Sequence, residues 1–109
     1  MPITVWHNKS FMKYAIVNFT TKDKAVLMPC TICKVAVVDN PFLGVAYKMT
    51  QDDWGPSKIV QPASPRLSNH RSTSVGDILQ LDNEEYYIVE LIGFRKLSSE
   101  EVSVITFNS

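Results

Sequence analysis

The sequence predicts a small α+β domain: a small twisted antiparallel sheet or partly closed β-barrel, with one helix at about residues 41–51 and a long loop at about residues 55–74. Three observations lead to this prediction. Apolar segments with strand-like alternation recur along the chain, one segment has apolar residues at helical spacing, and a stretch rich in Pro and Ser separates the two halves. The 109 residues match the length of one domain, so we expect residues 1–109 to share one core.

Composition and charge are those of an ordinary globular protein, with 45% hydrophobic and 20% charged residues and a formal net charge of zero. Residues 54–75 carry Lys58, Arg66 and Arg71 and no acid. Charge alone falls short of a nucleic-acid-binding footprint. The chain has no run of about 18 apolar residues and no N-terminal signal pattern. We therefore expect a cytoplasmic protein with no membrane partner.

Three strands are predicted in the first half of the chain. Residues 3–7 alternate and are rich in β-formers, so His7 is expected to be a half-buried strand residue rather than a catalytic base. Residues 14–20 also favour a strand, with a short helix as the competing interpretation. Residues 33–38 give the clearest strand, and Pro29 before them marks an edge, a bulge or a boundary.

The predicted helix begins with Asn40 as N-cap and Pro41 at the first helical position, where a missing N–H is tolerated. Its buried stripe is expected to comprise Phe42, Leu43, Ala46, Tyr47 and Thr50. Trp54 is expected to pack back onto the domain as the chain turns.

The loop at about residues 55–74 contains Pro56, Pro62 and Pro65, which exclude a helix or a central strand. A short edge pairing is expected only at residues 59–60. Loops of this length in small domains are more often functional or mobile than inert.

A hairpin follows, with one strand at residues 78–81, a connection at residues 82–85 and a long return strand at residues 86–97. Gly93 is expected to kink or bulge the return strand. Residues 98–101 are predicted to turn, and residues 102–107 to form the last strand.

The loop that enters this hairpin holds a local motif of Ser72, Ser74, Gly76 and Asp77. Gly76 permits a positive φ, and the Asp77 carboxylate can accept bonds from backbone N–H groups or from an Arg. The two serines can satisfy loop backbone groups. We therefore interpret the four residues, together with Gly93, as structural, with direct ligand contact as the alternative.

The run of residues 70–78, followed by Tyr87 and by residues 92–94, resembles the Ser-x-Ser-Val-(Ser/Gly)-Asp … Gly-Phe signature of YodL-like domains and related small proteins of phages, plasmids and conjugative elements. The match covers about 25 residues. The resemblance implies a mobile-element context and an accessory role, and it implies no defined mechanism.

Residues with reactive side chains give little support for an enzyme. Cys30 and Cys33 form a lone C-x-x-C, but the apolar run after it predicts a strand, which would place the two thiols on opposite faces. A zinc site would also need His7 and His70, which lack ligand spacing. Glu84 and Glu85 are expected to be a solvated pair, and no nucleotide-binding or nucleophile motif is present. We expect no cofactor and no metal.

The leading functional hypothesis is a non-enzymatic accessory binding protein of a phage or mobile element, such as a counter-defence protein that masks a partner protein. The candidate binding residues are Lys58, Arg66, His70, Arg71 and Tyr86. One alternative is a nucleic-acid-binding protein that uses the basic loop at residues 58–71. A second is a metal- or thiol-dependent protein that uses Cys30 and Cys33. Exposed strand edges would also allow a homodimer.

Overall fold

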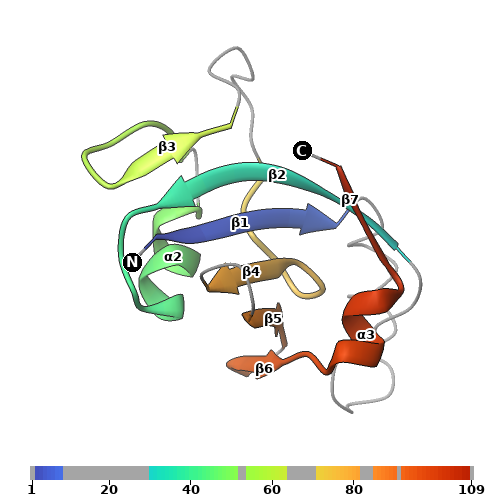
Figure 1. Cartoon of the computed structure of the whole chain (residues 1–109). Coiled ribbons are helices and arrows are strands. Elements are labelled where there is room, and N and C mark those ends of the chain that lie inside the picture. The colour runs from blue at the N-terminus through green and yellow to red at the C-terminus, as the bar shows by residue number, and fades with distance from the viewer. Residues whose placement is uncertain are drawn as a thin grey trace.

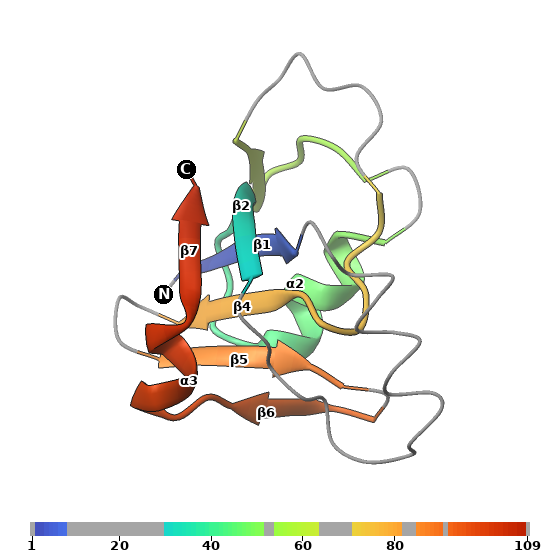
Figure 2. The ribbon, with the colours of Figure 1, turned by 90° about the vertical axis from the view of Figure 1, so that its right-hand side faces the viewer.

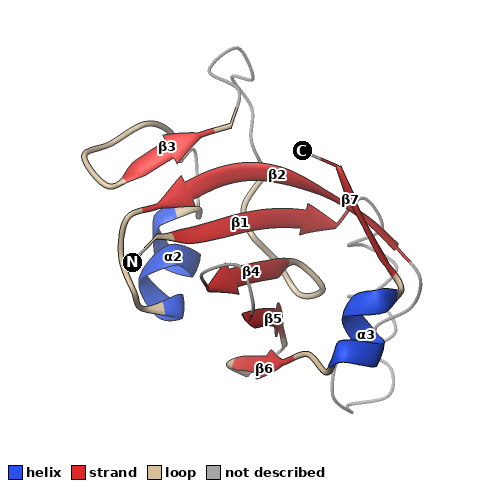
Figure 3. Ribbon diagram, viewed as in Figure 1, coloured by secondary structure: helices blue, strands red, loops and turns tan. Residues whose placement is uncertain are grey.

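The computed structural model describes residues 2–8, 30–51, 54–63, 71–81, 85–90 and 92–108 and shows a small α+β fold built on a mostly antiparallel sheet (Figures 1 and 3). The described strands are β1 (Ile3–Asn8), β2 (Cys30–Val38), β3 (Val60–Pro62), β4 (Ile78–Leu81), β5 (Glu85–Val89), β6 (Phe94–Lys96) and β7 (Ile105–Asn108). The described helices are α2 (Leu43–Met49) and α3 (Ser99–Ser103). The predicted fold class is confirmed, and the described sheet is open rather than closed into a barrel.

The strands lie in the order β3-β2-β1-β4-β5-β6, and β7 pairs with β2 outside this path. Every pairing is antiparallel except that of β7, which runs parallel to the first part of β2 (Figure 2). The predicted hairpin is confirmed, because β4 pairs with β5. The predicted strand at residues 14–20 lies outside the described residues.

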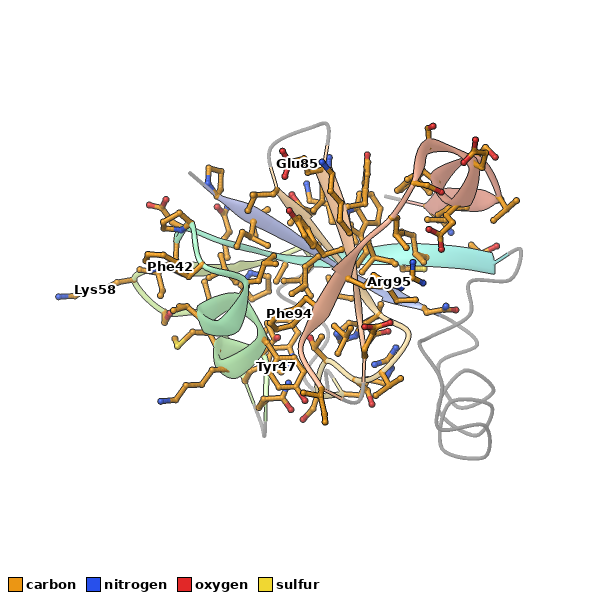
Figure 4. The ribbon with its side chains drawn as sticks, turned by 90° about the horizontal axis from the view of Figure 1, so that it is seen from below. Phe42, Tyr47, Lys58, Glu85, Phe94 and Arg95 are labelled. Carbon is orange, nitrogen blue, oxygen red and sulfur yellow. The ribbon has the colours of Figure 1, made fainter. Side chains whose placement is uncertain are left out.

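Each face of the sheet has its own buried cluster, because successive strand residues point to opposite faces. The cluster under α2 contains Ile3, Val5, Ala36, Val38, Ala46, Trp54, Val60, Leu79 and Val89. The cluster on the other face contains Trp6, Ile32, Ile78, Ile88, Leu97 and Ile105, with Val102 of α3 packed against it. Figure 4 shows α2 and α3 on opposite sides of the strands.

An irregularity in the pairing of β1 with β2 lies near the middle of both strands. Val5 pairs with Ala36 and Trp6 pairs with Lys34, so Val35 has no partner on β1. Its carbonyl instead accepts a hydrogen bond of 2.9 Å from the N–H of Ala63, just after β3. This extra residue bends β2.

Helix α2 begins two residues later than predicted. Asn40 lies before the helix, where its Oδ1 accepts a 2.9 Å bond from the N–H of Phe42, and Phe42 is the N-cap. The side chain of Phe42 is 68% exposed, so its predicted place in the buried stripe is wrong. Ala46 and Thr50 are buried as predicted, and Trp54 packs back into the same cluster.

The long return strand predicted for residues 86–97 is wrong. The chain reverses at Gly93, which has a φ of +78°, and β6 pairs back antiparallel onto β5. A Gly at positive φ is compatible with a tight reversal of the chain or with a bulge. The antiparallel pairing of β5 with β6 shows that it is a reversal. The N–H of Glu90 donates to the carbonyl of Gly93 at 3.1 Å.

A second correction concerns residues 98–104, which comprise α3 (Ser99–Ser103) and its two capping residues instead of a turn and the start of a strand. Ser98 is the N-cap, and its Oγ accepts from the N–H of Glu101 at 3.2 Å. The Glu101 carboxylate accepts from the N–H of Ser98 at 3.1 Å, which completes a capping box. The last strand therefore begins at Ile105. None of the described helices has the length and apolar character needed to cross a membrane.

Glu101 also joins α3 to β6, because Arg95 Nη1 donates to its carboxylate at 3.1 Å. Burial raises the pKa of Glu101, but the bonds from Ser98 and Arg95 outweigh burial and hold it below its usual value of 4.5. We expect Glu101→Gln to lower the free energy of unfolding by about 1 kcal/mol at pH 7.

The stability that the Glu101 carboxylate contributes should decrease at low pH. A carboxylate with a lowered folded pKa contributes stability above its unfolded pKa and loses it as the pH falls through the folded pKa. Urea unfolding at pH 7 and pH 3 should therefore show a difference between the wild type and Glu101→Gln that shrinks at low pH. A difference that stays constant would contradict the ionic contribution.

Strand β3 lies within the predicted loop at residues 55–74. An edge pairing is present there, but it joins Val60–Pro62 to residues 36–38 and so lies slightly later than the predicted residues 59–60. The outer edge of β3 is covered by its own approach loop. Ser57 Oγ accepts from the N–H of Val60 at 3.1 Å, and the Val60 carbonyl accepts from the N–H of Ser57 at 3.0 Å. Pro62 has no N–H, so little of this edge remains for another strand.

Candidate functional site

The most strongly bonded residue of the loop at residues 71–77 is Asp77, whose side chain is fully buried at the start of β4. Its carboxylate accepts from the backbone N–H groups of Asn8 and Ser74, both at 2.7 Å. It also accepts from both terminal nitrogens of Arg71, at 2.6 and 2.7 Å. The carboxylate thus ties the loop to the end of β1.

The Arg71 guanidinium also donates hydrogen bonds to two backbone carbonyls. Nη2 donates to the carbonyl of Asn8 at 3.0 Å, and Nη1 donates to the carbonyl of Ser72 at 3.0 Å. Planar guanidinium groups suit such a forked arrangement because several N–H donors point in fixed directions. The side chain is 28% exposed, so the loop buries most of the group that was proposed to meet a ligand.

A second layer of polar contacts fixes the same loop to the end of α2. Thr73 Oγ1 lies 2.7 Å from Thr50 Oγ1 and 3.0 Å from His7 Nε2. The N–H of Thr73 donates to the Thr50 carbonyl at 3.0 Å, and Gln51 Nε2 donates to the Thr73 carbonyl at 2.9 Å. Trp54 Nε1 donates to the carbonyl of Arg71 at 3.0 Å. His7 is therefore buried and hydrogen-bonded to Thr73.

Burial and the neighbouring groups shift the pKa of Asp77 in opposite directions. Burial raises the pKa of Asp77 above its ordinary value of 3.8, whereas Arg71 and the N–H groups of Asn8 and Ser74 act to lower it. A buried carboxylate needs such partners because leaving water is costly for a charge. The arrangement holds a loop in place and leaves no acceptor of Asp77 directed at open solvent. Gly76 supplies the turn before it, with a φ of +93°.

The described surface also has a groove along β3. Two adjoining hollows of about 350 and 400 Å³ share Val37, Gln61 and Pro62. The first hollow is also lined by Lys34 and Ala63, and the second by residues 56–60 and Asp39. We call this continuous surface the β3 groove.

The structure separates the residues that the sequence suggested as one binding surface. Lys58 lines the β3 groove at its outer rim and extends away from the body of the protein (Figure 4). Arg71 belongs to the loop cluster around Asp77. Tyr86 lies on β5, four strands from β3, and its ring is 5.3 Å from that of Phe107. Arg66 and His70 lie outside the described residues.

The predicted structural residues do lie together, apart from Gly93, which reverses the chain between β5 and β6. The described bonds of Ser72 and Ser74 involve their backbone groups. Sequence reasoning missed Lys34 and Gln61 of the β3 groove. An alternating strand with an exposed Lys is too common to mark a surface, and the pairing of β2 with β3 places the two residues together only in the fold.

The two cysteines lie in one strand. Cys33 is a free, partly buried thiol and pairs with His7 across β1 and β2. Among the described residues, no group of three or more His, Cys, Asp and Glu side chains could hold a metal ion. The side chain of Cys30 and all of His70 lie outside the description, so the thiol and zinc alternatives stay predictions.

Comparisons with models of protein families, with curated proteins and with solved structures find no match for this chain.

Proposed function

We propose that this chain is a binding protein without catalytic activity, an accessory protein of a phage or mobile element that acts in the cytoplasm by covering the surface of a partner protein. The observation that carries the proposal is that His7, Arg71 and Asp77 have structural roles. These side chains are the ones best suited to acid–base or anion chemistry in the described part of the chain, and all three are engaged in holding the loop at residues 71–77.

The open surface supports the same proposal. The β3 groove is shallow and has a mixed lining of polar and apolar side chains. A surface of this kind suits contact with another macromolecule better than enclosure of a small substrate, because small-molecule sites bury most of their ligand. The resemblance of residues 70–78 to proteins of mobile elements supplies the proposed context.

Affinity purification tests this proposal. We expect the immobilised wild-type protein to retain one host protein in stoichiometric amount from a host lysate at moderate salt, before and after nuclease treatment. Quantitative mass spectrometry against uncoupled resin measures the enrichment. A partner that disappears after nuclease treatment would favour the nucleic-acid alternative, whose binding should also weaken steeply with salt. No stoichiometric partner in either case would contradict the proposal.

A further inference from the structure

The β3 groove has cationic ends and a small apolar floor. Lys34 and Lys58 are exposed, and no ion pair with another described residue engages either of them. Among the described residues that line the groove, Asp39 is the acidic side chain. The described lining therefore carries a net positive charge, although the whole chain has a formal net charge of zero.

Backbone pairing does not explain how a partner would use this groove. The N–H and carbonyl of Val60 are already bonded to Ser57, and Pro62 has no N–H. Addition of a strand to β3 would therefore lack most of its ladder bonds. Recognition must then come from the side chains on the face of the strand.

The dimensions and lining favour an extended chain over a helix. A docked helix needs a continuous apolar groove for a stripe of anchors three to four residues apart. Here the residues that line both hollows are Val37, Pro62 and the exposed Gln61, so the shared apolar lining is small and includes an amide. An extended segment can place a small apolar side chain on this floor while its backbone bonds to Gln61.

We propose that the β3 groove binds an extended acidic segment of a partner protein, with its carboxylates directed at Lys34 and Lys58. This inference rests on the proposed function and adds the site and the chemistry of the partner segment. Opposite charges on the two surfaces would give specificity and a fast encounter. The two cations among the described lining residues favour a protein segment over a nucleic acid, which would need a larger basic footprint.

The test is a titration of the whole ¹⁵N-labelled chain with defined probes, followed by NMR. The probe is a pool of acetylated and amidated heptapeptides, each with two Glu among Pro, Val and Gly; a second pool has Gln in place of Glu. We expect saturable shifts of the amide signals of Lys34, Val37, Gln61 and Ala63 with the Glu pool and much smaller shifts with the Gln pool. Equal response to both pools, or no response at these amides, would overturn the inference.

Charge-reversal variants sharpen the result. Lys34→Glu with Lys58→Glu should weaken binding of the Glu pool at least tenfold. The matched control is Lys48→Glu with Lys96→Glu, which makes the same change of net charge at exposed positions of α2 and β6 and should leave binding unchanged. If both double variants lost the same affinity for the Glu pool, the loss would be an effect of net charge, and the β3 groove would not be the binding site. Tighter binding of an oligothymidylate than of the Glu pool at the same amides would assign the groove to nucleic acid.

The same variants separate this inference from the proposed function. If the affinity purification yields a partner that both double variants retain equally, the proposed function stands and the groove is not its site. If no partner is retained by the wild type, the proposed function fails whatever the peptide pools show.

Discussion

Replacing Asp77 with Ala should lower the free energy of unfolding by about 3–5 kcal/mol. The change removes the carboxylate from a partly buried Arg71 and leaves the N–H groups of Asn8 and Ser74 without their acceptor. Buried donors that lose their acceptor carry the full cost of desolvation. Urea unfolding followed by the fluorescence of the two buried Trp side chains measures the loss.

Asp39 provides the matched control, because the same Asp→Ala change there removes an exposed side chain. We expect Asp39→Ala to change the free energy of unfolding by no more than about 0.5 kcal/mol. A double-mutant cycle with Arg71→Met should show strong coupling, so that the double variant loses less than the sum of the two single losses. A loss below about 1 kcal/mol for Asp77→Ala would contradict the assigned role of the cluster.

The part of the fold that local chemistry determines could be predicted from the sequence. The loop into β4 is one case, because a Gly that tolerates positive φ next to an Asp that accepts N–H groups favours the same turn in any context. The hairpin of β4 and β5 is another, since two alternating apolar segments with a polar connection have few other ways to bury their side chains.

Long-range pairing accounts for most of what the sequence did not reveal. Gly93 could serve a bulge or a reversal, and only the bonds of β6 with β5 distinguish the two. The parallel pairing of β7 with β2 joins Ile105 to Cys30 across most of the chain, and no local pattern encodes it. Helix α3 is different, because Ser98 and Glu101 have the spacing of a capping box, so a local signal was present.

In the candidate site, too, local sequence patterns were not enough to predict the contacts that long-range pairing creates. Arg71 stood in a basic loop and was interpreted as a group for an anionic partner, but the fold gives it a carboxylate six residues along the chain and a carbonyl of β1. A charged residue near a matching charge is often a structural pair, and sequence alone does not show which pairs the backbone brings together. Lys58, another candidate residue of the same basic loop, instead lines the β3 groove, which forms only when β2 and β3 pair.

The cluster of aromatic rings beneath β7 is the second place where one substitution should have a large effect. Trp6 is 7% exposed, its Nε1 donates to Gln80 Oε1 at 2.9 Å, and its ring meets that of Phe107 edge-on at 5.2 Å. Trp6→Ala should cost about 3–5 kcal/mol, because it opens a cavity and leaves the buried Gln80 amide without its donor.

The matched control is Phe42→Ala, which truncates an aromatic ring that is 68% exposed and should change the free energy of unfolding by no more than about 0.5 kcal/mol. Phe107 is 39% exposed, so Phe107→Ala should fall between the two, at about 1–2 kcal/mol. Because Phe107 links β7 to Trp6 on β1 and to Tyr86 on β5, this order of the three variants reports how β7 is held on the sheet. A Phe107→Ala variant that loses no more stability than Phe42→Ala in urea unfolding would contradict the arrangement of β7.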